Sequence, residues 1–68
     1  MTMRLTVNGA PTEVDQGVTV AALVATLADQ RRRVAVAVNG EVVPRSSWET
    51  TPLRDGDRVE VLAAVAGG

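Results

Sequence analysis

The sequence predicts an α+β domain with one sheet and one helix packed across it. Short stretches of alternating or β-branched residues occur on either side of two Asn-Gly pairs, and a single stretch repeats apolar residues at helical spacing. With 68 residues, the chain has the length of one domain spanning 1–68. An amphipathic helix with one apolar face needs one sheet face to cover it, which favours a two-layer architecture.

The first predicted element is a β-hairpin. Residues 3–7 alternate apolar and polar side chains, as a half-buried strand does. Asn8-Gly9 favours a two-residue turn, because both positions of that turn need positive φ. The chain returns through residues 12–15, and Pro11 near the start of this second strand favours a sheet edge, where its missing N–H does no harm.

A helix is predicted after Thr19, whose side chain is suited to an N-cap. Ala22 stands where a capping box would carry Glu. The helix is expected to end near residues 28–30, and the Arg run at 31–33 is interpreted as its solvated end, favoured by the helix dipole. The apolar stripe consists of Val20, Leu23, Val24 and Leu27.

The second half of the chain predicts three strands. Residues 34–38 form a β-branched run closed by Asn39-Gly40, and residues 41–43 return briefly before Pro44. Residues 45–51 have no clear period and are expected to form a short helical turn.

Within that turn, Ser46-Ser47 has no base to activate it, and Trp48 is interpreted as a cap on the core rather than an interface anchor. Asp55-Gly56-Asp57 is predicted to be a turn rather than a calcium loop, since the distal ligands are missing. Residues 58–65 form the last predicted strand.

The alternation of the strands assigns side chains to two faces. The outer face keeps the charges of Arg4 and Glu60 but is otherwise small or apolar, so we expect it to be a docking surface for partners. The expected docking residues are Thr6, Ala35, Ala37, Leu62 and Ala64, with Leu62 between the other four. The inward set is Met3, Leu5, Val7, Val14, Val36, Val38, Val59, Val61 and Ala63.

Composition excludes several classes of function. The chain has no His and no Cys, which removes thiolate and imidazole metal sites, Ser-His catalysis and disulfides. A net charge of −1 and a single aromatic residue disfavour nucleic-acid binding. The longest apolar runs have six residues, whereas a bilayer span needs about 20, so no membrane segment is predicted and a cytoplasmic location is expected.

The strongest candidate site is the chain end. Residues 66–68 are expected to form a flexible tail, in which Gly67 and Ala66 thread a narrow channel of a partner and Gly68 offers its α-carboxylate. Two terminal glycines arise by chance in roughly 0.5% of chains at an average glycine frequency of about 7%.

The chain resembles the ThiS family of sulfur carriers of thiamine biosynthesis, within the ubiquitin-like β-grasp superfamily. This resemblance implies a mixed sheet of four to five strands with one helix. The segments that carry the resemblance follow the family's order over nearly the whole chain. They are Val7-Asn8-Gly9, Gly17-Val18-Thr19-Val20 before Leu23, Ala37-Val38-Asn39-Gly40, Val43-Pro44-Arg45 with Trp48, Asp55-Gly56-Asp57 and Val65-Ala66-Gly67-Gly68.

The resemblance implies a co-substrate rather than an enzyme. A ThiF-type adenylyltransferase would use ATP and magnesium to convert the Gly68 carboxylate to an acyl-adenylate, with no cofactor bound by the carrier itself. A persulfide sulfur donor would then displace AMP and leave a thiocarboxylate. A ThiG-type thiazole synthase would take that sulfur for the thiazole ring of thiamine.

Three alternatives remain open from the sequence. A related carrier could serve molybdopterin, cysteine or tRNA thiolation with an identical tail. A ubiquitin-like modifier would use Gly68 for isopeptide bonds, although this chain has no Lys through which it could itself be extended. A plain interaction module would survive the loss of Gly67 and Gly68.

Overall fold

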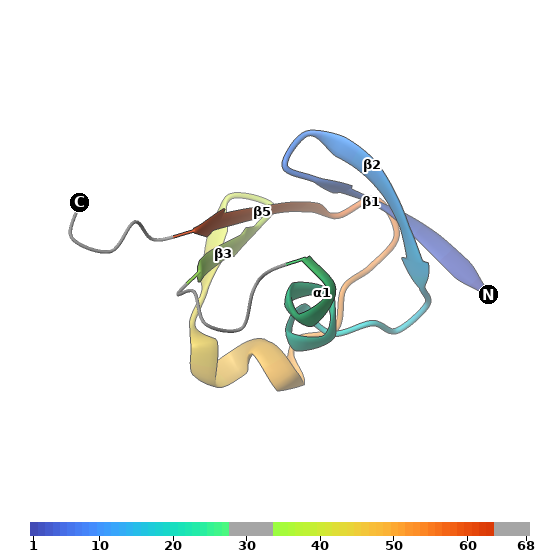
Figure 1. Ribbon diagram of the computed structural model, residues 1–68. Helices are drawn as coiled ribbons and strands as arrows, with labels where there is room; N and C mark the ends of the chain where they lie inside the picture. Colours follow the sequence, from blue (N-terminus) through green and yellow to red (C-terminus); the bar gives the residue numbers. More distant parts are fainter. Residues whose placement is uncertain (28–33, 64–68) are drawn as a thin grey trace.

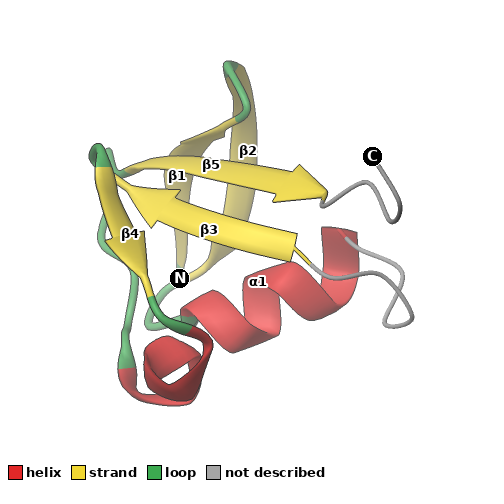
Figure 2. Ribbon diagram, turned by 90° about the vertical axis from the view of Figure 1, so that its left-hand side faces the viewer, coloured by secondary structure: helices red, strands yellow, loops and turns green. Residues whose placement is uncertain are grey.

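The computed structural model describes residues 1–27 and 34–63. Five strands form one sheet in the order β2-β1-β5-β3-β4. Helix α1 and the 3-10 helix η1 lie on one side of this sheet, as Figures 1 and 2 show. The strands are β1 (Thr2–Val7), β2 (Ala10–Asp15), β3 (Val34–Val38), β4 (Glu41–Val43) and β5 (Arg58–Ala63), and the helices are α1 (Val20–Leu27) and η1 (Arg45–Thr50).

The sheet is mixed, and its last strand lies in the middle. β5 pairs parallel with β1 on one side and antiparallel with β3 on the other. The hairpins β1–β2 and β3–β4 form the two halves around it. β2 is an edge strand, which confirms the position inferred from Pro11. The fold is therefore a ubiquitin-like β-grasp, as the sequence resemblance implies.

Both Asn-Gly pairs form the predicted two-residue turns. Asn8 and Gly9 have φ angles of 50° and 81°, and Asn39 and Gly40 have 52° and 83°. Positive φ at both central positions is the signature of the type I′ turn, whose twist matches that of the flanking strands. Each turn fixes the register of its hairpin, so that Val7 lies opposite Ala10.

Helix α1 begins where the sequence predicts. The backbone N–H of Ala22 donates to Thr19 Oγ1 at 3.2 Å, which confirms the N-cap. Val20, Leu23 and Val24 are buried, but Leu27 is 47% exposed and so does not extend the buried stripe as expected. The expected helix end at residues 28–30 and the Arg run at 31–33 lie outside the described residues.

The core lies between the sheet and the helices and contains no buried polar or charged side chain among the described residues. Trp48 is 8% exposed and donates its Nε1–H to the Val43 carbonyl at 2.9 Å, which confirms its core role. Leu53, absent from the predicted core, is 3% exposed, and its N–H bonds the Val18 carbonyl at 2.8 Å. The buried cluster is Met3, Leu5, Val7, Val20, Leu23, Val24, Val36, Trp48, Leu53 and Val59.

The Asp55-Gly56-Asp57 segment is a turn, as predicted, with Gly56 at a φ of 88°. Asp55 Oδ1 accepts a hydrogen bond from the Arg4 N–H at 2.8 Å, and Asp57 Oδ2 accepts one from the Arg54 N–H at 2.8 Å. Both carboxylates therefore hold backbone groups. In residues 1–27 and 34–63, no three or more His, Cys, Asp or Glu side chains are grouped so that they could hold a metal ion.

Candidate functional site: the outer face of the sheet and the end of β5

β5 is the element that leads to the predicted reactive end of the chain. It was expected to run to residue 65 and is described to Ala63, which lies opposite Val34 of β3. Ala64 and the tail residues Ala66, Gly67 and Gly68 lie outside the described residues. The structure therefore locates the last part of the sheet before the tail.

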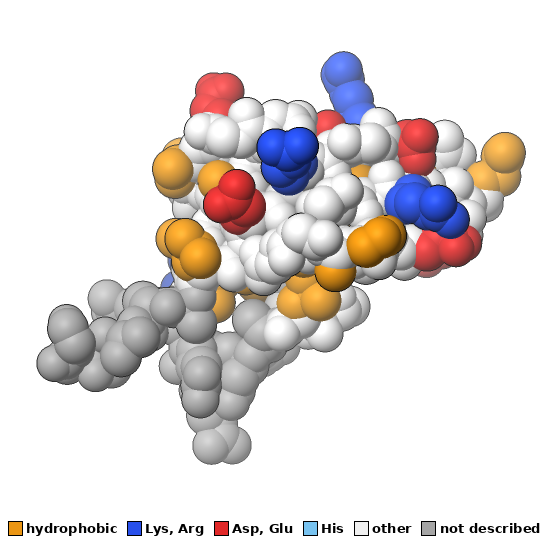
Figure 3. Space-filling view, turned by 90° about the horizontal axis from the view of Figure 1, so that it is seen from above, with side chains coloured by type: hydrophobic (Ala, Val, Ile, Leu, Met, Phe, Trp, Pro, Cys, Tyr) orange, Lys and Arg blue, Asp and Glu red, His pale blue; other side chains and the backbone are white. Residues whose placement is uncertain are grey.

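The outer face of the sheet, which looks away from α1, carries an apolar patch near this point. Leu62 is 64% exposed and lies directly opposite Ala35, while Ala37 lies opposite Glu60 on one side and Val42 on the other. Val42 is 71% exposed. Figure 3 shows hydrophobic side chains toward the end of this face where β5 ends. We call Leu62, Ala35, Ala37 and Val42 the outer patch.

Thr6 does not adjoin Leu62 as the sequence analysis expected. The parallel register places Thr6 opposite Arg58, at the start of β5, and Leu62 follows four residues later. At about 3.3 Å per residue, this is a separation of roughly 13 Å along the strand. The pairing of β1 with β5 sets this separation, and no local sequence pattern indicates that pairing.

Val42 is the docking candidate that sequence reasoning missed. A two-residue turn at residues 39–40 pairs residue 37 with residue 42, as the structure shows. Side chains of directly paired residues share a face, so an outward Ala37 requires an outward Val42. The spacing of the hairpin in the sequence therefore indicates that Val42 lies on the outer face.

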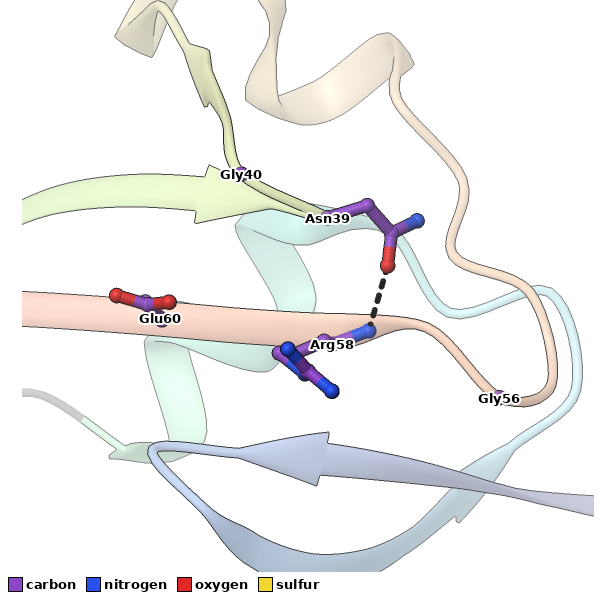
Figure 4. A pocket seen from close by; sticks show the side chains of 5 residues that line it. All are labelled: Asn39, Gly40, Gly56, Arg58 and Glu60. Carbon is purple, nitrogen blue, oxygen red and sulfur yellow. Dashed lines mark hydrogen bonds between the residues drawn. The ribbon is translucent and has the colours of Figure 1, made fainter.

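Two shallow hollows flank the charged part of the outer face. One, of about 330 Å³, is lined by Asn39, Gly40, Gly56, Arg58 and Glu60 (Figure 4). The other, of about 450 Å³, is lined by Thr6, Asn8, Gly9, Arg58 and Glu60. Arg58 and Glu60 line both hollows, so a positive and a negative side chain stand between the two Asn-Gly turns.

These observations describe a small ubiquitin-like β-grasp domain with an exposed apolar patch on the outer face of its sheet, and the sequence continues from the central strand β5 to Gly67-Gly68. The ThiS family model matches residues 5–68. The chain belongs to the ThiS family.

Individual relatives agree with this assignment. The chain is 30% identical over 66 residues to the sulfur carrier protein ThiS of Escherichia coli, with 97% of this chain and 100% of that protein covered. The crystal structure of the thiamine biosynthesis protein ThiS from Geobacter metallireducens matches with a TM-score of 0.81 and 40% identity, covering 97% of this chain and 100% of that one. The family is thus that of small sulfur carriers in thiamine biosynthesis.

A longer relative is a thiazole synthase from Paramagnetospirillum magneticum, 39% identical over 66 residues. That match covers 97% of this chain but only 20% of the thiazole synthase, so the chain spans one fifth of that protein's length. Within the described part of the chain, no helix is long and apolar enough to cross a membrane.

Proposed function

We propose that this chain carries sulfur as a thiocarboxylate on Gly68 and donates it to thiazole formation in thiamine biosynthesis. The observation that carries the proposal is the ThiS family match, which runs through the Gly-Gly end to residue 68. The full-length match to the Escherichia coli sulfur carrier supports it. The chain acts as a co-substrate of its partners, in the cytoplasm.

The proposed chemistry starts from a poor electrophile. A carboxylate resists nucleophilic attack, so the Gly68 oxygen first attacks the α-phosphate of ATP, with magnesium, on a ThiF-type adenylyltransferase, and pyrophosphate leaves. The terminal sulfur of a persulfide then attacks the acyl carbon, and AMP leaves. A thiol cleaves the resulting S–S bond, supplying two electrons, and the thiocarboxylate remains on the carrier.

This chemistry needs no side chain of the carrier. The described residues hold no buried charged or polar side chain that could act as an acid or base in a shielded site. ATP, magnesium and the persulfide are bound by the partners. The carrier supplies a narrow end, because Gly67 and Gly68 have no side chain to obstruct a channel.

The outer patch is the proposed docking surface for these partners. A short tail offers too little area for specific binding, so a partner that reaches Gly68 must also contact the folded part nearby. Leu62 and Val42 are exposed apolar side chains on the sheet from which the tail continues. Arg58 and Glu60 supply charges beside them that can select one partner over another.

A ThiG-type thiazole synthase is the proposed acceptor of the sulfur. The Paramagnetospirillum magneticum thiazole synthase contains a segment similar to this chain over one fifth of its length. Carrier and synthase joined in one polypeptide would meet at high effective concentration, which supports their use in the same reaction.

Intact mass measurement on the protein recovered from its own cells tests the proposal. Replacement of one oxygen by sulfur, localised to Gly68 by fragmentation, is the expected result. A Gly68 that remains a plain carboxylate in thiamine-starved cells, or that is linked to Lys of other proteins, would overturn it.

Tail variants test the activation step. A chain ending at Ala66 should fold like the wild type but fail in ATP–pyrophosphate exchange with the cognate adenylyltransferase. Gly67→Val should lose most turnover, because a β-branched side chain enters the channel and restricts φ and ψ. Normal exchange by the truncated chain would show that the tail is incidental.

A further inference from the structure

Asn8 bonds β5 with its side chain at the point where β1 turns away. The backbone ladder between the two strands includes the Thr6 N–H to the Asp57 carbonyl at 3.0 Å and the Asn8 N–H to the Val59 carbonyl at 2.9 Å. The next residue on this edge of β5 is Val61. Its N–H donates to Asn8 Oδ1 at 2.8 Å, and its carbonyl accepts from Asn8 Nδ2 at 3.2 Å.

The Asn8 carboxamide therefore takes the place of a peptide group. A parallel ladder contacts every second residue of the facing strand, and the positions on β5 are 57, 59 and 61. At 61 the β1 backbone has already entered the Asn8-Gly9 turn, so the side chain supplies both the acceptor and the donor. Both bonds are within normal hydrogen-bond distance.

Asn39 makes a similar contact on the opposite edge of β5 and at its opposite end. The Asn39 N–H donates to the Arg58 carbonyl at 2.7 Å, and the Arg58 N–H donates to Asn39 Oδ1 at 3.0 Å, which Figure 4 shows. In an antiparallel pair, the second acceptor would be the Asn39 backbone carbonyl. Asn39 Nδ2 donates to Asp57 Oδ1 at 3.0 Å. Two Asn-Gly turns thus hold one strand with two side-chain amides.

The two contacts differ in their distance from the reactive end. Asn39 holds Arg58, the first residue of β5, whereas Asn8 holds Val61, next to Leu62 and two residues before the end of the strand. On the β1 side, Asn8 makes the last bond to β5 within the described residues. We propose that Asn8 is a positioning residue, which sets the direction in which β5 delivers the Gly-Gly end to a partner's active site.

This inference rests on the proposed function. Five residues follow Ala63, and they span at most about 18 Å when extended. Loosening β5 at Val61 shifts the point from which these residues start, whereas the pairing of β5 with β3 still holds Leu62 opposite Ala35. Loss of the Asn8 contact should therefore impair reaction of the bound carrier more than its binding.

Paired glycine variants separate positioning from stability. Glycine readily adopts the positive φ of both positions, so each variant can keep a Gly-Gly turn. Each variant removes two side-chain hydrogen bonds: Asn8→Gly those to Val61, and Asn39→Gly those to Arg58 and Asp57. We expect Asn8→Gly to lower kcat of the adenylyltransferase for the carrier by roughly tenfold or more with little change in KM, since small misplacements of reacting groups have effects of this size. Asn39→Gly should change kcat by less than about twofold at a similar loss of thermal stability.

Amide hydrogen exchange at Val61 reports the contact directly, without any partner. We expect the Val61 N–H to be protected in the wild type and to exchange faster in Asn8→Gly but not in Asn39→Gly. Asn8→Asp keeps an acceptor for the Val61 N–H and loses the donor to its carbonyl, so its kcat should lie between wild type and Asn8→Gly. If Asn8→Gly does not fold, Asn8→Asp takes its place in the kinetic comparison with Asn39→Gly.

Three results would overturn the inference. They are equal kcat for Asn8→Gly and Asn39→Gly, an effect of Asn8→Gly confined to KM, and an unprotected Val61 amide in the wild type. If the wild type itself is not adenylated by the cognate enzyme, the proposed function fails, whereas an active wild type with an unaffected Asn8→Gly rejects the positioning role alone.

Discussion

Leu5 and Leu62 are the same residue type on the same sheet, yet their environments are opposite. Leu5 in β1 is 1% exposed and packs in the core, whereas Leu62 in β5 is 64% exposed on the outer face. α1 and η1 lie against the inner face (Figure 2), and no described element lies against the outer one. One leucine therefore stabilises the fold, and the other is available to a partner.

The two faces of this one sheet therefore have different roles, the inner face in folding and the outer face in recognition. A domain of this size buries only about 60% of its unfolded surface, so few inward side chains can be lost. An exposed leucine alone would carry no meaning, but Leu62 has small or apolar neighbours in Ala35, Ala37 and Val42. Substitutions on the two faces should therefore act on different measurable quantities.

Leu5→Ala should have the largest effect. It removes a fully buried side chain and leaves a cavity, which costs about 2–5 kcal/mol of unfolding free energy. Urea denaturation followed by Trp48 fluorescence measures the loss. Leu62→Ala is the matched control and should change stability by less than about 0.5 kcal/mol. Equal destabilisation by the two would show that both faces are buried in solution.

Trp48→Phe tests the core where η1 contributes to it. The change removes the hydrogen bond from Nε1 to the Val43 carbonyl and part of the packed ring, so we expect a loss of about 1–3 kcal/mol. Thermal unfolding followed by far-UV circular dichroism measures it. Affinity for the adenylyltransferase should be unchanged once the variant is folded; a selective loss of binding would make Trp48 an interface residue after all.

Leu62→Asp should act on binding rather than on stability. A carboxylate in the centre of the outer patch should weaken binding to the adenylyltransferase or to thiazole synthase by about 1–2 kcal/mol, the range of central apolar contacts. Titration calorimetry and a melting curve on the same sample measure both quantities. Leu27→Asp, an exposed leucine on α1, is the control and should bind normally. Unaltered affinity of Leu62→Asp would remove the outer patch from the docking surface.

Val42→Asp should have the smallest effect. Val42 lies on the edge strand β4, at the margin of the outer patch, so its loss should weaken binding by less than about 1 kcal/mol. The same calorimetric titration applies. A larger effect than that of Leu62→Asp would move the centre of the docking surface from β5 toward β4.

The local elements and the faces of the strands follow from the amino-acid sequence alone. Three features that short stretches of sequence predict are present in the structure. They are the two Asn-Gly turns, the Thr19 cap and the edge position of the strand that contains Pro11. The alternation of side chains within β5 correctly predicts that Val59 is buried in the core and that Leu62 is exposed on the outer face. The exposed position of Val42 could also have been inferred, because a two-residue turn leaves one register.

The way in which distant segments meet depends instead on the packing of the whole domain. The parallel register of β1 against β5 joins residues about fifty positions apart, and it moved Thr6 away from Leu62. The same register brings Asn8 to Val61 and gives its side chain a function that no local pattern indicates. The burial of Leu53 also depends on a distant contact, with Val18. Such contacts follow from closing the whole core, because a strand's offset against a remote partner is set by packing rather than by its neighbours in the chain.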